Sequence, residues 1–211
     1  MRAFVFGAAM LAAAVATSPR DSAALPRGYS GADLLQNCSD ATLCELYLRA
    51  LVDAYDTLMV WGNARSRICT PRPQEPAVLW QAVSATLSAR PERLSASAGS
   101  LIIDALQVNF RCAAAAAPTA TLFAPRDGVD LATQCTNSTN CEPVLYAVLD
   151  AHQTLVDWQT IRRPFVCLPE NSTLAEWRLA VLRYLGEHLD QLAVHTSASL
   201  VLTAMAQRYP C

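Results

Sequence analysis

Residues 31–61 read GADLLQNCSDATLCELYLRALVDAYDTLMVW, and residues 128–158 read GVDLATQCTNSTNCEPVLYAVLDAHQTLVDW. The two stretches align without a gap and are identical at 14 of 31 positions. Unrelated segments of ordinary composition would match at about two positions. The chain therefore contains an internal duplication, and this repeat decides the fold.

The eight cysteines repeat in the same order. Successive cysteines are 6, 25 and 43 residues apart in the first copy, and 6, 26 and 44 residues apart in the second. We place the first copy at residues 31–112 and the second at residues 127–211. Residues 113–126 hold two prolines and no apolar period, which is typical of a short connector. Each copy has about 85 residues, a size at which covalent cross-links matter to stability.

Residues 1–16 have the pattern of a secretory signal peptide. Arg2 precedes an apolar run that extends to about Val15, and a small-residue cleavage pattern ends at Ala16. The run is too short to span a bilayer, which takes about 20 apolar residues. We expect cleavage after Ala16, or as late as Ala24, and a soluble exported protein whose cysteines can oxidise.

The composition excludes several classes of protein. With 53% hydrophobic and 16% charged residues the chain is not intrinsically disordered, and a net charge of −2 without a basic run is unlike a nucleic-acid-binding protein. No later stretch has the length and hydropathy of a transmembrane segment. Paired C-x₂₋₄-C spacing is missing, so the cysteines are predicted to form disulfides and not a zinc site. No glycine-rich phosphate loop is visible, and we expect no cofactor.

Apolar residues in each copy follow the 3.6-residue period of helices with one buried face. The sequence predicts an all-α protein of two small, disulfide-stapled domains of about four helices each. The expected ranges are 32–37, 42–61, 77–88 and 98–110 in the first copy, and 129–134, 139–158, 174–187 and 197–208 in the second. Three helix starts fit the capping box, in which the side chain of a Ser or Thr and that of a Glu three residues later each accept a hydrogen bond from the other's backbone amide: Thr42–Glu45, Thr139–Glu142 and Thr173–Glu176.

Four cysteines in one copy allow three pairings. The first two cysteines flank the turn between helices one and two, so they are close in sequence. The third precedes helix three and the fourth follows helix four, and in an antiparallel hairpin these two ends lie together. The predicted disulfides are Cys38–Cys44, Cys69–Cys112, Cys135–Cys141 and Cys167–Cys211.

The second copy contains a characteristic run of motifs. Residues 167–174 read CLPENSTL, residues 181–185 read VLRYL, residues 198–204 read ASLVLTA, and residues 209–211 read YPC. These motifs resemble those of the Rap/Tai immunity proteins, and the resemblance covers nearly all of residues 128–211. Members of that family are small helical proteins with disulfides that are exported to the periplasm.

The resemblance implies a function for the chain. Rap/Tai proteins bind peptidoglycan amidase toxins that type VI secretion delivers, and they block the toxin's active site without catalysis of their own. We therefore expect a periplasmic immunity-like protein with a cognate cell-wall-degrading toxin as partner. The family members are single domains, some of them dimeric, so two fused copies suggest either an internal pseudo-dimer or a homo-oligomer.

Few residues suggest catalysis. A nucleophile–base–acid set is not visible, because the histidines occur in the second copy only and do not recur. We interpret them as packed or solvated side chains: His152, His188 and His195. Asp53 and Asp150 do recur, inside the second helix of each copy. Two interpretations are open. The acids have a direct function, or they have a structural role, in which each forms a hydrogen bond with a neighbouring threonine or caps a nearby helix end; the structural role is favoured.

The tryptophans also recur in pairs. They are either core residues or anchors for a partner, and their helical spacing favours the core: Trp61, Trp80, Trp158 and Trp177.

The loops at residues 62–68 and 159–166, which precede the third cysteine of each copy, hold the candidate partner-binding residues. Their arginines have no apolar period and are expected to be exposed beside a disulfide-stapled turn. Such cations could meet an acidic cleft of a partner, or they could be ordinary solvated residues: Arg65, Arg67, Arg162 and Arg163. A second hypothesis is a periplasmic helical carrier or interaction module for a small apolar ligand. An enzyme is the least favoured hypothesis.

Overall fold

The computed structural model describes residues 28–69, 75–112 and 126–211. The expected signal peptide and nearly all of the expected connector lie outside these residues. In the first repeat the helices are α1 (Gly31–Asn37), α2 (Ala41–Trp61), α3 (Pro76–Ser88), the 3₁₀ turn η1 (Pro91–Arg93) and α4 (Ala98–Asn109). The second repeat has the same order: α5 (Gly128–Thr136), α6 (Ser138–Asp157), α7 (Leu174–Glu187), η2 (Leu189–Gln191) and α8 (Ser197–Arg208).

The described part of the chain contains helices and isolated bridges but no strand, which confirms the predicted all-α class. Helix α7 has the predicted bounds, and Thr173 and Glu176 form the predicted capping box. The other two predicted capping boxes are wrong. Asp40 caps α2 and Asn137 caps α6, two residues before the threonines, because their side-chain oxygens accept the first free amides of the helix, including those of Thr42 and Thr139.

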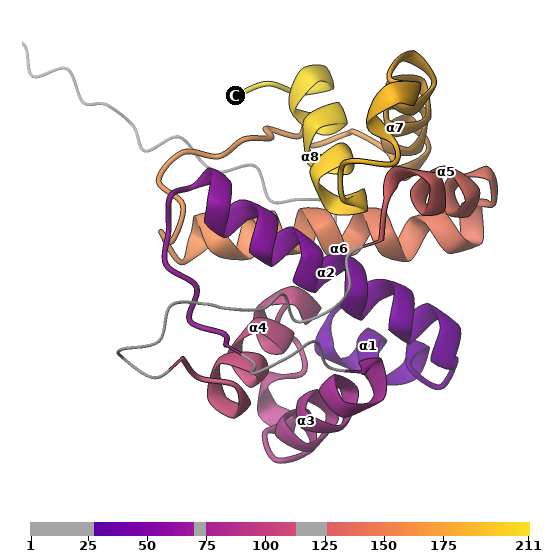
Figure 1. Cartoon of the computed structure of the whole chain (residues 1–211). Helices are drawn as coiled ribbons and strands as arrows, with labels where there is room; N and C mark the ends of the chain where they lie inside the picture. Colours follow the sequence, from indigo (N-terminus) through magenta and orange to yellow (C-terminus); the bar gives the residue numbers. More distant parts are fainter. Residues whose placement is uncertain (1–27, 70–74, 113–125) are drawn as a thin grey trace, which may run out of the picture.

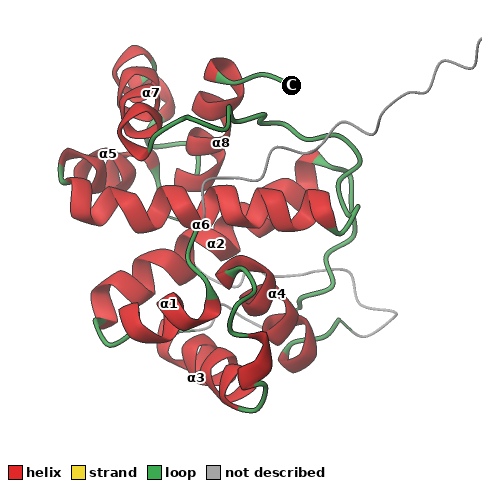
Figure 2. Cartoon of the chain, turned by 180° about the vertical axis from the view of Figure 1, so that it is seen from behind, coloured by secondary structure: helices red, strands yellow, loops and turns green. Residues whose placement is uncertain are grey.

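The two long helices α2 and α6 pack against each other at the centre of the molecule, and form its most extensive helix pair (Figure 1). Helices α1, α3 and α4 lie on one side of this pair, and α5, α7 and α8 lie on the other (Figure 2). Helix α2 also packs on α8, and α6 packs on α4, so each long helix contacts the other repeat's last helix. The two repeats therefore share one hydrophobic core. No helix in the described ranges combines the length and hydropathy that crossing a membrane requires.

Each repeat is closed by the same two kinds of disulfide. Cys38–Cys44 and Cys135–Cys141 join the first helix of a repeat to the second, at a separation of six residues. Cys69–Cys112 and Cys167–Cys211 join the segment before the third helix to the segment after the fourth, because α3 with α4 and α7 with α8 form hairpins. These are the four pairs expected from helix polarity.

A glycine begins the first helix of each repeat because the backbone of the same repeat approaches closely there. A Cβ atom on Gly31 would lie 3.2 Å from the backbone of Leu94, and one on Gly128 would lie 2.8 Å from the backbone of Leu192. The approach at Gly128 is closer than real Cβ atoms show and the approach at Gly31 is tighter than most, so a side chain would press the helix against the turn that follows η1 or η2. The recurring glycine thus reflects packing.

Candidate functional site: an arginine-lined hollow between the repeats

The two arginine loops leave the core on the same side of the molecule. Helices α2 and α6 run in the same general direction, so their C-terminal ends and the loops that follow emerge together (Figure 1). Residues 61–67 of the first repeat and 158–165 of the second line one surface hollow of about 870 Å³. We call it the arginine hollow.

Side chains from both repeats build its wall. Ile161 is buried and packs on Gly62, where a Cβ atom would lie 2.6 Å from Cγ2 of the isoleucine. Trp61 meets Phe165 edge to face, with ring centroids 5.6 Å apart. These contacts connect a residue of the first repeat with one of the second, so the two loops hold each other in place.

The arginine hollow carries a concentrated positive charge. All four predicted arginines are exposed and line it, and its lining contains no acidic residue. Within the described ranges no carboxylate lies within ion-pair distance of their guanidinium groups. The sequence predicted these four residues from two separate loops, and the structure brings them together: Arg65, Arg67, Arg162 and Arg163.

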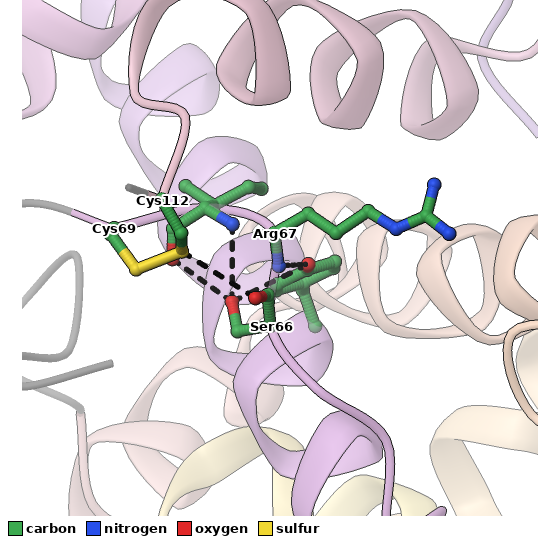
Figure 3. The surroundings of a disulfide bond; sticks show 6 residues. Ser66, Arg67, Cys69 and Cys112 are labelled. Atoms are coloured by element: carbon green, nitrogen blue, oxygen red, sulfur yellow. Dashed lines mark hydrogen bonds between the residues drawn. A yellow bond between two sulfur atoms is a disulfide. The ribbon is translucent and has the colours of Figure 1, made fainter. Parts of the chain in front are cut away.

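In the first repeat, a buried tyrosine and a disulfide fix the loop. The hydroxyl of Tyr55 accepts a hydrogen bond from the backbone amide of Arg67 at 3.0 Å. The Ser66 hydroxyl donates to the carbonyl of Ile68 at 2.9 Å, and the Ser66 carbonyl oxygen lies 3.4 Å from Sγ of Cys112. Figure 3 shows the Arg67 side chain extending away from the disulfide. The backbone is thus fixed while the guanidinium group stays free to meet a partner.

In the second repeat a histidine takes the same position. His152 is the counterpart of Tyr55, and its Nε2 accepts the backbone amide of Phe165 at 3.0 Å. Burial lowers the pKa of His152 to about 4, so at neutral pH the ring is neutral and Nε2 is free to accept. This histidine therefore positions a loop, as Tyr55 does.

The other two histidines have local surroundings of their own. His188 ends α7, where its Nδ1 lies 2.9 Å from the carbonyl oxygen of Tyr184 and its ring stacks on the tyrosine ring at 4.1 Å. His195 is exposed. In the described residues no group of His, Cys, Asp and Glu side chains could hold a metal ion.

The prediction that all four tryptophans belong to the core is wrong for two of them. Trp177 is buried and donates to Ser172 at 3.0 Å, and Trp80 is half-buried against the core. Trp61 and Trp158 are each 40% exposed and line the arginine hollow. They lie at the C-terminal ends of α2 and α6, beyond the last buried residues of these helices. Their position directly before the arginine loops was the signal that could have assigned them to the site.

Asp53 and Asp150 cap helix ends, and each caps a helix of the opposite repeat. Asp53 on α2 accepts the amide of Ala198 in α8 at 2.9 Å, and Asp150 on α6 accepts the amide of Gly99 in α4 at 2.6 Å. The N-cap hydroxyls of these helices add further hydrogen bonds. Burial raises the pKa of both carboxyls, for Asp53 to about 6. The paired acids thus link the two repeats.

The arrangement as a whole is suited to recognition. Fixed backbone, exposed guanidinium groups and half-exposed aromatic rings are the composition of protein-binding hot spots. Burial shifts the pKa values of Asp53, Asp150 and His152; Asp53 is half-buried, the other two are buried, and none of the three lines the hollow.

Comparison with known proteins gives one match. The family model described as Rap1a immunity proteins matches the chain twice, at residues 30–112 and 127–211. No curated protein and no solved structure matches it significantly.

Proposed function

The chain belongs to the Rap1a immunity protein family, and from this premise we propose that it is a periplasmic protein that binds a cell-wall-degrading toxin of the peptidoglycan amidase type and blocks it. The toxin would be one delivered by type VI secretion. The chain acts by surface complementarity and takes no part in bond making or breaking.

The arginine hollow is the observation that carries this proposal. Four exposed guanidinium groups, which form no ion pair with any described residue, lie together with two exposed tryptophans on a backbone that Tyr55, His152 and the disulfides hold fixed. A preorganised surface loses little conformational entropy when it binds. Arg and Trp are the residues whose truncation costs most at interfaces, so we assign the toxin contact to Arg65, Arg67, Arg162 and Arg163.

Two further features support export to the periplasm. The leader at residues 1–16 has the pattern of a secretory signal. All eight cysteines are paired within the fold, which is typical of proteins that mature in an oxidising compartment. A polar, cationic hollow is unlike the enclosed apolar space that a carrier of small apolar ligands would offer, and no observation favours that alternative.

Inhibition of a purified toxin tests the proposal. The mature chain is titrated into candidate peptidoglycan amidases encoded next to its gene, and release of soluble fragments from purified sacculi is measured. We expect stoichiometric inhibition of at least one candidate. A variant with all four hollow arginines changed to glutamine should lose inhibition. The control Arg183→Gln, an exposed arginine on α7 that lines a different surface hollow, should inhibit as the parent does. Failure to inhibit any candidate would contradict the proposal.

A further inference from the structure

The arginine hollow contains equivalent parts of both repeats within one continuous surface. Its lining runs from Trp61 to Arg67 and from Trp158 to Phe165. We infer that these two halves form a single composite site, which takes one acidic peptide segment of a partner per chain. The inference rests on the proposed function in one respect, since the acidic segment would belong to the toxin.

The shared wall argues against two independent sites. Ile161 and Phe165 of the second repeat pack directly on Gly62 and Trp61 of the first. Further inside, α2 and α6 fill the space between the repeats. A ligand on one loop would therefore contact the other loop, and the two halves cannot be occupied separately.

The charge of the hollow specifies the chemistry of its occupant. Four exposed guanidinium groups share one space without a carboxylate in the lining. Mutual repulsion is tolerated there because the groups are solvated, and a partner with several carboxylates would relieve it. Arginine binds carboxylates through two parallel hydrogen bonds, so each pair of arginines can hold its own acidic side chain.

The size and aromatic content of the hollow favour a peptide over a small anion. Its volume of about 870 Å³ is much larger than one phosphate or carboxylate requires. Trp61 and Trp158, each 40% exposed, offer apolar surface between the charges, against which the backbone and methylene groups of a peptide can pack. An acidic segment uses both features.

Titration with a defined peptide tests the inference without any toxin. The probe is acetyl-tetraglutamate-amide, added to the mature chain at low ionic strength. Calorimetry gives the stoichiometry, and the fluorescence of the two exposed tryptophans reports the location. We expect one equivalent per chain, a change in tryptophan emission, and weakening of binding as salt is added.

Arginine pairs then distinguish one site from two. In a composite site, either Arg65→Gln/Arg67→Gln or Arg162→Gln/Arg163→Gln should weaken binding at least tenfold, and the stoichiometry should remain one. Two independent sites would leave half the capacity at the parent's affinity. Arg183→Gln should bind as the parent does. Binding of two equivalents, half capacity in either pair variant, no binding of the peptide, or equal binding of inorganic phosphate would overturn the inference. A composite site that binds the peptide while no amidase is inhibited would refute only the proposed function.

Discussion

Tyr47 of the first repeat donates a hydrogen bond of 2.7 Å to Asp150 of the second, and both side chains are buried. The equivalent acid, Asp53, has no such donor, because Val144 occupies the position that corresponds to Tyr47. The pseudo-symmetry of the two repeats is therefore broken at a buried polar contact between them. Asp150 depends on residues of the first repeat for its main hydrogen bonds, from Tyr47 and from the amide of Gly99.

Removal of that phenol should destabilise the fold. Tyr47→Phe keeps the ring and deprives the buried carboxyl of Asp150 of one donor, so we expect a loss of about 1–3 kcal/mol in the free energy of unfolding. Chemical denaturation at neutral pH measures the loss. Tyr146→Phe, which removes the hydroxyl of a half-buried tyrosine on α6, is the control and should change stability by less than about 0.5 kcal/mol. Equal effects of the two variants would contradict this role for Tyr47.

Asp53 should make the fold less stable as pH rises from about 4 to about 6. Burial raises the pKa of this carboxyl from 3.8 to about 6 in the folded state, so in that range the folded chain holds a proton that the unfolded chain has lost. Its contribution is complete below pH 4 and lost above pH 6, a difference of about 3 kcal/mol. Asp53→Asn should remove it. The parent's free energy of unfolding minus that of the variant should therefore fall by about this amount between pH 4 and pH 7. A constant difference would show that Asp53 does not titrate in this way.

His152 should make the fold more stable as pH rises from about 4 to about 6.5, which is opposite to the effect of Asp53. Burial lowers its pKa from 6.5 to about 4, so between these values the unfolded chain binds a proton that the folded chain does not. The stabilisation is complete above pH 6.5, and about 3 kcal/mol is lost as pH falls to 4. His152→Gln, which cannot titrate, should lack this loss. Denaturation curves of the variant and the parent at pH 4 and pH 7 measure it, and identical pH profiles would contradict the prediction.

The local parts of this structure could be predicted from the sequence, and the contacts between repeats could not. Thr173 and Glu176 lie within one turn, so a short motif was enough to locate the start of α7. Asp40 and Asn137 were missed as caps because a Thr-x-x-Glu pattern two residues later competed with them. The amide that Asp53 accepts lies 145 residues away in the chain, and no local pattern contains that information.

The candidate site was predicted in part for the same reason. The arginines were identified because they lie in polar loops before a cysteine. The four arginines line one hollow because α2 and α6 pack side by side in the same direction, and the duplication alone does not specify this packing. Trp61 and Trp158 were assigned to the core because their spacing continues the buried stripe, but the last buried residues of the two helices are Met59 and Leu155, and the tryptophans lie beyond them.

The long disulfides should contribute more to stability than the short ones. Cys69–Cys112 closes a separation of 43 residues and Cys38–Cys44 one of six, so the chain-entropy model gives about 4 and about 2 kcal/mol. Replacement of each pair by serine, followed by denaturation under oxidising conditions, measures both losses. The Cys69/Cys112 variant should also release the Ser66–Ile68 segment, with faster hydrogen exchange at the amide of Arg67. A larger loss from the short bridge would contradict the order.

Gly99 should resist replacement by alanine although it lies inside a helix. Alanine normally gains about 1 kcal/mol over glycine there. A Cβ atom at this position, however, would lie 2.7 Å from Cγ of Asp150, whose carboxyl Tyr47 holds in place. The carboxyl must then move and lose hydrogen bonds, so Gly99→Ala should destabilise the fold by about 1–3 kcal/mol.

The matched control is Ala198, the equivalent position in the second repeat. Its amide donates to Asp53 at 2.9 Å, a longer hydrogen bond than the 2.6 Å between the amide of Gly99 and Asp150. Ala198→Gly should cost about 1 kcal/mol through helix propensity alone. Combining Gly99→Ala with Tyr47→Phe should cost less than the sum of the single changes, because the carboxyl of Asp150 is then free to withdraw. Stabilisation by Gly99→Ala, or strict additivity of the pair, would show that the close approach of Asp150 to α4 does not constrain this glycine.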